Sequence, residues 1–129
     1  MLWFKIDFHS GVPAYQQIID KIKELIISGN LQADDPLPSI RELAKELNVN
    51  PNTVARSYRD LETEGYIYSR PGVGSFISAQ NEQTIKNKAL SLIKEELYAT
   101  LLTAQKYNLN KATISSLIDQ LIREVYGGE

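Results

Sequence analysis

Residues 37–77 constrain the fold more than any other part of the chain. They begin with an apolar stripe at helical spacing, end that stripe at Asn48, and start a second helical pattern after Asn50-Pro51. Asparagine is a common N-cap, and proline suits the first helical turn because no backbone N–H is needed there. Two short strand patterns around a glycine-bearing turn follow. This order predicts a helix-turn-helix followed by a β-hairpin wing.

Apolar stripes indicate which side of each helix is buried. The first helix should begin near Ser39, a good N-cap, and stop at Asn48. Its predicted stripe is Ile40, Leu43, Ala44 and Leu47. The second helix, which Gly65 ends as a left-handed cap, should bury Val54, Tyr58 and Leu61. Polar residues recur at steps of four, three and four on its opposite side: Asn52, Arg56, Arg59 and Thr63.

The outward side of this second helix has the chemistry that DNA reading needs. An α-helix fits the major groove, where asparagine pairs with adenine edges and arginine pairs with guanine edges. The alternative is an ordinary solvated helix face. The preceding helix, the short turn and the following hairpin all agree with a DNA-binding motif, so they favour the first interpretation.

The predicted wing covers residues 66–77 and turns at residues 70–74. The glycines Gly72 and Gly74 permit a sharp tip, whose backbone can approach a phosphate or enter the minor groove. Arg70 adds positive charge beside that tip. This segment is not a nucleotide-binding glycine loop, because it is too short for one and leads into a strand.

Taken together, these motifs resemble the GntR family of bacterial transcriptional regulators over roughly residues 12–79. The segments that carry the resemblance are Leu37-Pro38-Ser39-Ile40-Arg41-Glu42-Leu43-Ala44, Asn50-Pro51-Asn52-Thr53-Val54, Leu61-Glu62-Thr63-Glu64-Gly65-Tyr66-Ile67 and Arg70-Pro71-Gly72-Val73-Gly74-Ser75-Phe76. The resemblance implies DNA contacts from Arg41, from the start of the second helix and from a wing-tip glycine. Some members carry an arginine two positions after the threonine, where this chain has Ala55.

The outward helix face, the wing and the resemblance together define a predicted DNA-binding set. Its members are Ser39, Arg41, Asn50, Asn52, Thr53, Arg56, Arg59, Arg70, Gly72, Val73 and Gly74. The compact C-terminal region further resembles the YtrA-like subfamily. That resemblance implies control of a transporter-type operon.

The N-terminal part is expected to support the DNA-binding pair. A helix over residues 13–28 has the stripe Ile18, Ile22, Leu25 and Ile26, flanked by Tyr15 and Ile19. Residues 2–8 alternate and predict a short strand or an extended arm, with Trp3 as a packing anchor. Residues 31–36 read as a polar loop with a turn at Asp34-Asp35-Pro36.

Size and charge exclude several classes of protein. The chain has 129 residues and 43% hydrophobic content, enough for one small domain and an appendage. The net charge of −2 argues against indiscriminate nucleic-acid binding, so the arginines must be segregated from the carboxylates. With no cysteine and a single histidine, His9, we expect no metal site and no cofactor. Neither a secretion signal nor a membrane span is apparent, so a cytoplasmic protein is expected.

A polar break near residues 79–82 divides the chain into a DNA-binding domain, residues 1–79, and a two-helix dimerisation region, residues 80–129. The fold class is therefore mostly α with one small β-hairpin. The predicted dimerisation stripes are Leu90, Ile93, Leu97 and Leu101 on the first helix and Ile114, Leu117, Ile118, Leu121, Ile122 and Val125 on the second. A lone two-helix hairpin buries too little surface, so these faces need either the DNA-binding domain or, preferably, a second chain.

The leading hypothesis is a dimeric, sequence-specific DNA-binding regulator that represses a transporter-type operon from a palindromic operator. The alternative is a winged-helix module that binds protein and no DNA. An enzyme is disfavoured because no nucleophile–base set, metal cluster or phosphate loop is visible. A small-molecule effector stays open, since Tyr98, Tyr107 and Tyr126 can either line a pocket in the helical hairpin or pack as core.

Overall fold

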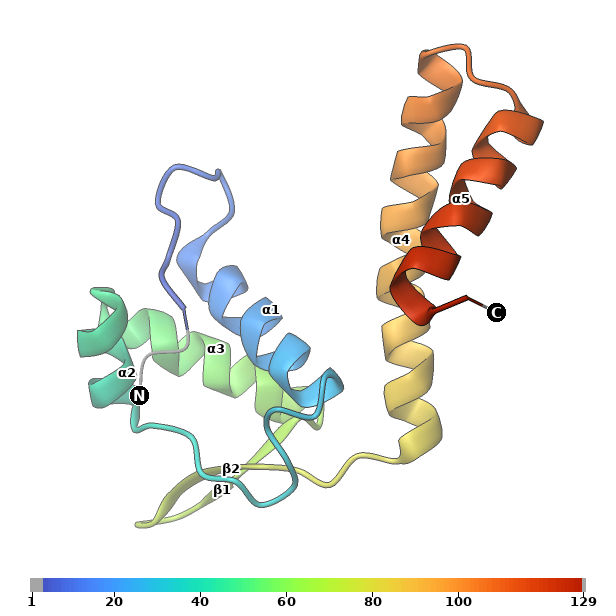
Figure 1. Ribbon diagram of the computed structural model, residues 1–129. Coiled ribbons are helices and arrows are strands. Elements are labelled where there is room, and N and C mark those ends of the chain that lie inside the picture. Colours follow the sequence, from blue (N-terminus) through green and yellow to red (C-terminus); the bar gives the residue numbers. More distant parts are fainter. Residues whose placement is uncertain (1–3, 129) are drawn as a thin grey trace. The chain divides into compact units, whose positions relative to one another are not determined.

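The computed structural model describes residues 4–128 and divides the chain into two compact units, Met1–Lys86 and Asn87–Glu129. The elements, in chain order, are α1 (Ala14–Ile27), α2 (Ile40–Leu47), α3 (Pro51–Thr63), β1 (Ile67–Arg70), β2 (Gly74–Ile77), α4 (Glu82–Lys106) and α5 (Lys111–Tyr126) (Figure 1). The predicted fold class, mostly helical with one hairpin, is confirmed. The polar break does separate β2 from α4, but the boundary between the two compact units falls within α4, after Lys86.

In the first unit, α1 and α2 both pack against α3 (Figure 1). Its largest fully buried side chains are Ile18, Ile22, Leu43, Leu61, Ile77 and Val54. One stripe prediction was wrong at Ile40, which is 38% exposed, because the first side chain of a helix leans beyond its packed face. On α1 the buried face is rotated from the predicted one, so Ile19 is buried and Leu25 only half-buried.

Local capping explains where α2 and α3 begin and end. Ser39 forms a capping box with Glu42, in which the Ser39 Oγ accepts from the Glu42 N–H at 3.1 Å and the Ser39 N–H donates to Glu42 Oε1 at 3.2 Å. Asn48 ends α2 in the left-handed region, with φ of 57°. Asn50 then caps α3 through a 2.8 Å bond from the Asn52 N–H, and Pro51 takes the first helical position.

The wing is a two-stranded hairpin, as predicted, with one additional bridge to the segment ahead of α2. β1 and β2 pair antiparallel, with Ile67 opposite Ile77. The segment just before α2 also pairs with β2, because the Leu37 N–H donates to the Ser75 carbonyl and the Ile77 N–H donates to the Asp35 carbonyl, both at 2.9 Å. Part of the predicted polar loop thus pairs its backbone with β2 through this isolated bridge.

The N-terminal arm reaches the core through Ile6 and Phe4. Ile6 is buried and Phe4 is half-buried, whereas Phe8 is exposed. Residues 4–6 form no strand, so the described part of the predicted segment is an extended arm, and Trp3 lies outside the described residues. The amide of Gln17 ties the arm to α1 through bonds with the backbone of Asp7 and with the Val12 carbonyl.

The second unit is an antiparallel pair made from most of α4 and all of α5, joined at residues 107–110 (Figure 1). Asn108 takes a left-handed conformation in this turn, and the Asn110 side chain caps α5 by accepting from the Thr113 N–H at 2.9 Å. Along Glu82–Lys106 and Lys111–Tyr126, Ala104 is the single buried side chain. None of the helices within residues 4–128 has both the length and the apolar character to span a bilayer.

Candidate nucleic-acid interface

The outward side of α3 is exposed as its residue spacing predicts. Asn52, Arg56, Arg59 and Thr63 are all exposed, while Val54, Tyr58 and Leu61 are buried. The outward side chains therefore stand on a helix whose opposite side is fixed in the core.

Two buried hydroxyl groups fix α3 in place. The Ser57 Oγ donates to the Tyr15 carbonyl of α1 at 2.9 Å, and the Tyr58 hydroxyl donates to the Pro38 carbonyl ahead of α2 at 2.7 Å. Burial, helped by the nearby charges of Glu42 and Glu46, raises the pKa of Tyr58 above its ordinary value, so this hydroxyl stays protonated and keeps donating. α3 is thus hydrogen-bonded to both neighbouring segments.

Arg56 has a defined position on this face. Its guanidinium carbon lies over the ring of Tyr15 in α1, 3.6 Å from the ring centroid. Within residues 4–128 Arg56 has no ion-pair or hydrogen-bond partner for its guanidinium. Its N–H groups are therefore available to an outside acceptor such as a base edge or a phosphate.

The predicted residues at the two helix starts have partly committed side chains. The oxygens of Ser39 and Asn50 accept capping bonds, and the Asn50 amide N–H groups remain as donors. Hydrogen bonding to the side chain and to the backbone N–H of Ser39 lowers the pKa of Glu42, so its carboxylate stays charged. Arg41 itself is exposed, and Thr53 is half-buried.

Two carboxylates at the end of α3, Glu62 and Glu64, have protein partners. Glu62 accepts from the Ser69 N–H at 3.2 Å and from the Ser69 Oγ at 2.9 Å. Glu64 pairs with Lys23 of α1, with 3.2 Å between the Lys23 Nζ and the Glu64 Oε2. These contacts give two of the carboxylates protein partners, which agrees with the charge segregation expected of a DNA-binding chain with a net charge of −2.

The wing tip is a tight turn closed by a 2.9 Å bond from the Val73 N–H to the Arg70 carbonyl. Pro71 and Gly72 fill its central positions, and Gly72 has φ of +75°, as a type II turn requires. Val73 is 68% exposed at this tip. The predicted tip residues are therefore presented to solvent together.

Sequence reasoning missed the contacts that hold the wing. The Tyr68 and Phe76 rings stack with centroids 5.6 Å apart, and the Tyr68 hydroxyl donates to Asp34 Oδ1 at 2.7 Å. That bond to a carboxylate raises the pKa of Tyr68. Arg70 lies more loosely over Phe76, at 5.8 Å from the ring centroid. The alternation around Tyr68 was the one sequence signal for this arrangement.

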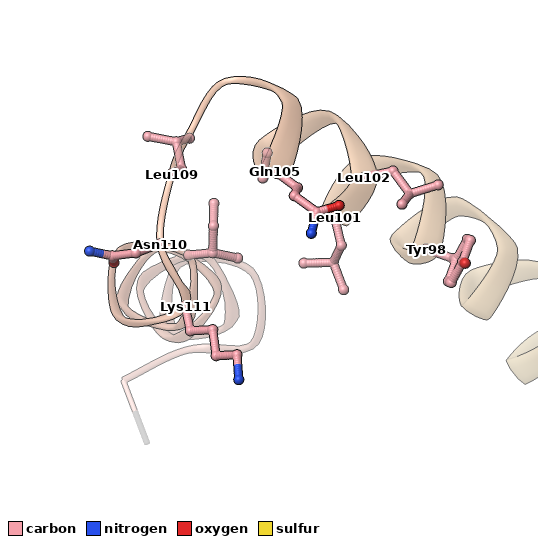
Figure 2. Close-up of a pocket in the computed structure, with 9 residues that line it drawn as sticks. Tyr98, Leu101, Leu102, Gln105, Leu109, Asn110 and Lys111 are labelled. Atoms are coloured by element: carbon pink, nitrogen blue, oxygen red, sulfur yellow. The ribbon is translucent and has the colours of Figure 1, made fainter.

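The second unit has a large unpartnered apolar surface. The predicted stripe residues of α4 and α5 are all exposed or half-buried, and Val125 reaches 76% exposure. A cavity of about 330 Å³ lies beside the turn between the two helices, lined by Tyr98, Leu101, Leu102, Ala104, Gln105, Leu109, Asn110, Lys111 and Ile114 (Figure 2). Of the three tyrosines considered from the sequence, only Tyr98 lines it.

Across residues 4–128, no three His, Asp or Glu side chains gather closely enough to bind a metal ion.

Comparison with known proteins places the chain in a family. A model of the gntR family of bacterial regulatory proteins matches residues 14–77. The chain is 36% identical to the HTH-type transcriptional repressor YtrA of Bacillus subtilis (strain 168), over 97% of this chain and 96% of that protein. The crystal structure of a transcriptional regulator from Oenococcus oeni is 31% identical, with a TM-score of 0.76 over 91% of this chain and 97% of that chain.

A third similar protein was solved in complex with DNA. The DNA-binding domain of AraR, solved in complex with its operator ORX1, is 25% identical, with a TM-score of 0.55 over 58% of this chain and 95% of that chain. The part of this chain that it covers is about the length of the first unit. The chain belongs to the GntR family of bacterial regulatory proteins and is a DNA-binding transcriptional regulator.

Proposed function

We propose that this regulator is a dimeric repressor that binds a palindromic operator and controls a transporter-type operon. The observation that carries the proposal is the joint exposure of the α3 outward face and the wing tip on one folded unit. In the proposal, residues 1–79 bind DNA and residues 80–129 hold two chains together.

Base edges are assigned to Asn52 and Arg56, which lie one helical turn apart on α3. The arginine guanidinium can donate to guanine, and the asparagine amide can both donate to and accept from adenine. The other members of the predicted set, at the helix starts, along α3 and at the wing tip, contact the DNA backbone or the minor groove. Phosphate contacts of this kind fix the register of the helix on the duplex.

A second copy of the chain is proposed to cover the apolar stripes of α4 and α5. Exposed leucines such as Leu97, Leu117 and Leu121 recur along both helices, and an isolated pair with so little buried surface is not stable alone. A twofold axis through this region gives two DNA-binding units, and two identical units match a site with twofold symmetry. Linking two DNA-binding units also strengthens binding, because it raises the effective concentration of the second unit at the DNA.

Repression and the target operon are proposed from similarity. YtrA of Bacillus subtilis is a transcriptional repressor, and the similarity extends along nearly the whole of both chains. A dimer bound at an operator blocks transcription by occupying the site that polymerase needs. Control of a transporter operon follows from the resemblance to the YtrA-like subfamily.

Selection from a randomised duplex library tests this function. The full-length protein is mixed with the library, bound duplexes are recovered over several rounds, and the selected sequence is compared with random DNA by fluorescence anisotropy. We expect a palindromic sequence that binds far more tightly than random DNA and takes up two chains per duplex. Enrichment of no sequence would favour the alternative, a winged-helix module that binds protein.

A further inference from the structure

We propose that Tyr15 is a positioning residue for DNA recognition, because its ring holds the Arg56 guanidinium in place before DNA arrives. This inference rests on the proposed function and adds to it a residue on α1, outside the helix-turn-helix. Tyr15 touches Arg56 and acts through it.

The geometry is that of a stack. A distance of 3.6 Å from the guanidinium carbon to the ring centroid is van der Waals contact over the face of the ring. A guanidinium stacked in this way has its N–H groups at the edges of its plane, where they can still reach an acceptor. The arginine of the wing differs, since Arg70 stands 5.8 Å from the Phe76 ring centroid.

The ring is itself held firmly. Tyr15 is half-buried and packs against the core. Its carbonyl accepts the bond from Ser57, the residue that follows Arg56, and the Ser57 hydroxyl is also 3.1 Å from the Thr53 carbonyl. Because Ser57 is fully buried, this link fixes the backbone of Tyr15 relative to the backbone beside Arg56.

Holding the guanidinium in advance favours binding through entropy. A free arginine side chain samples many rotamers, and ordering it at an interface costs about 0.5–1.5 kcal/mol. An arginine already stacked on an aromatic ring has lost much of that freedom in the unbound protein. Removing the ring should therefore weaken binding to the selected duplex about two- to tenfold.

A double-mutant cycle tests the inference on the full-length chain. Affinity for the selected duplex is measured for the wild type, Tyr15→Leu, Arg56→Ala and the double variant, with Tyr15→Phe as the matched control that keeps the ring. We expect Tyr15→Phe to bind like the wild type and Tyr15→Leu to bind more weakly. In the Arg56→Ala background, Tyr15→Leu should cause no further loss, because no guanidinium is left to hold.

A second measurement keeps the test valid if Tyr15→Leu folds poorly. In the free protein, the Arg56 side-chain protons should show an upfield ring-current shift by NMR, present in the wild type and in Tyr15→Phe. Absence of that shift in the wild type overturns the inference. So does an equal affinity loss from Tyr15→Leu with and without Arg56, or an equal loss in Tyr15→Phe and Tyr15→Leu.

The measurements distinguish failure of the proposed function from failure of the positioning role of Tyr15. If the wild type prefers no duplex over random DNA, the proposed function fails, and the ring-current shift alone then decides whether Tyr15 holds Arg56. If the wild type binds its selected duplex tightly and Tyr15→Leu binds it equally well, only the positioning role is lost.

Discussion

Glu62, near the end of the recognition helix, accepts two hydrogen bonds from Ser69 in the first wing strand, at 3.2 Å from its backbone nitrogen and 2.9 Å from its Oγ. The contact joins the element that is proposed to enter the major groove to the element that is proposed to approach the minor groove. It also turns one carboxylate of α3 toward protein. Helix and wing are thus joined by an exposed but charge-assisted pair of bonds.

Weakening this contact should loosen the wing without unfolding the domain. Ser69→Ala removes one of the two bonds, and Glu62→Ala removes both. Hydrogen exchange at the wing amides should rise in that order, while the free energy of unfolding falls by only about 1 kcal/mol because the site is exposed. Thr63→Ala is the matched control, since the Thr63 hydroxyl bonds the Arg59 carbonyl of its own helix. Equal wing exchange in all four proteins would contradict a bracing role.

Tyr58→Phe should destabilise the first unit by about 1 kcal/mol, because it deletes the hydroxyl that bonds the Pro38 carbonyl and keeps the buried ring. Urea denaturation measures this change. A loss of several kcal/mol would show that the ring had moved, which circular dichroism in the near ultraviolet would reveal.

The same variant makes a prediction about alkaline pH. In the unfolded chain Tyr58 loses its proton above about pH 10, whereas burial raises its pKa in the folded chain, so it stays protonated there. Above pH 10, unfolding therefore releases the proton of the Tyr58 hydroxyl. The contribution of this hydroxyl to the free energy of unfolding is complete below pH 10 and is lost as pH rises. Wild-type stability should fall by up to about 1.4 kcal/mol per pH unit more steeply than that of Tyr58→Phe above pH 10. Parallel curves for the two proteins would contradict the burial of this hydroxyl.

The sequence predicted the helix boundaries well because local chemistry determines them. Ser39 and Asn50 cap their helices through residues two or three positions away, and such short-range signals are visible in a linear sequence. The bridge between Pro36, ahead of α2, and Phe76 in β2 and the stack of Arg56 on Tyr15 join residues distant in the chain. Periodicity alone does not specify those pairings, because they depend on how α1 and the wing pack on α3.

At the wing tip, two substitutions of Gly72 distinguish the effect of backbone strain from the effect of DNA contact. With φ of +75° and nothing within 4 Å of a would-be Cβ, its substitution is limited by backbone conformation alone. Gly72→Val should lose about 1–2 kcal/mol of stability, whereas Gly72→Asn should lose less because asparagine tolerates this region. If the tip approaches DNA closely, Gly72→Asn should still bind the selected duplex more weakly. Unchanged affinity in Gly72→Asn would indicate a purely structural turn.

Charges on the apolar stripe of α5 should dissociate the proposed dimer. Leu117→Glu combined with Leu121→Glu places two carboxylates on one face, and burying them unpaired against a second chain is costly. Ser116→Glu is the control, since it adds a charge on the exposed, opposite side of the same helix. Sedimentation at micromolar concentration should give the mass of two chains for the wild type and the control and of one chain for the double variant. A monomeric wild type would refute the assignment.

The last prediction separates the residue that reads sequence from the residue that holds the backbone. Arg56 lies on the outward side of α3 and is held by Tyr15, while Arg41 lies exposed on α2, the helix that crosses the backbone in this motif. Losing a base contact costs roughly 1–3 kcal/mol and relaxes the preference at one position. Losing a phosphate contact weakens binding to all sequences alike and lowers the salt slope by about one unit.

Arg56→Ala should therefore shrink the ratio of affinities for the selected and random duplexes, and Arg41→Ala should lower both affinities and leave their ratio nearly unchanged. Titration of both variants against both duplexes at several salt concentrations measures the ratio and the slope together. The opposite pattern, in which Arg41→Ala loses the ratio and Arg56→Ala keeps it, would mean that α2 reads the bases. In that case the stack on Tyr15 would direct Arg56 to a phosphate, and Tyr15→Leu would weaken binding to both duplexes equally.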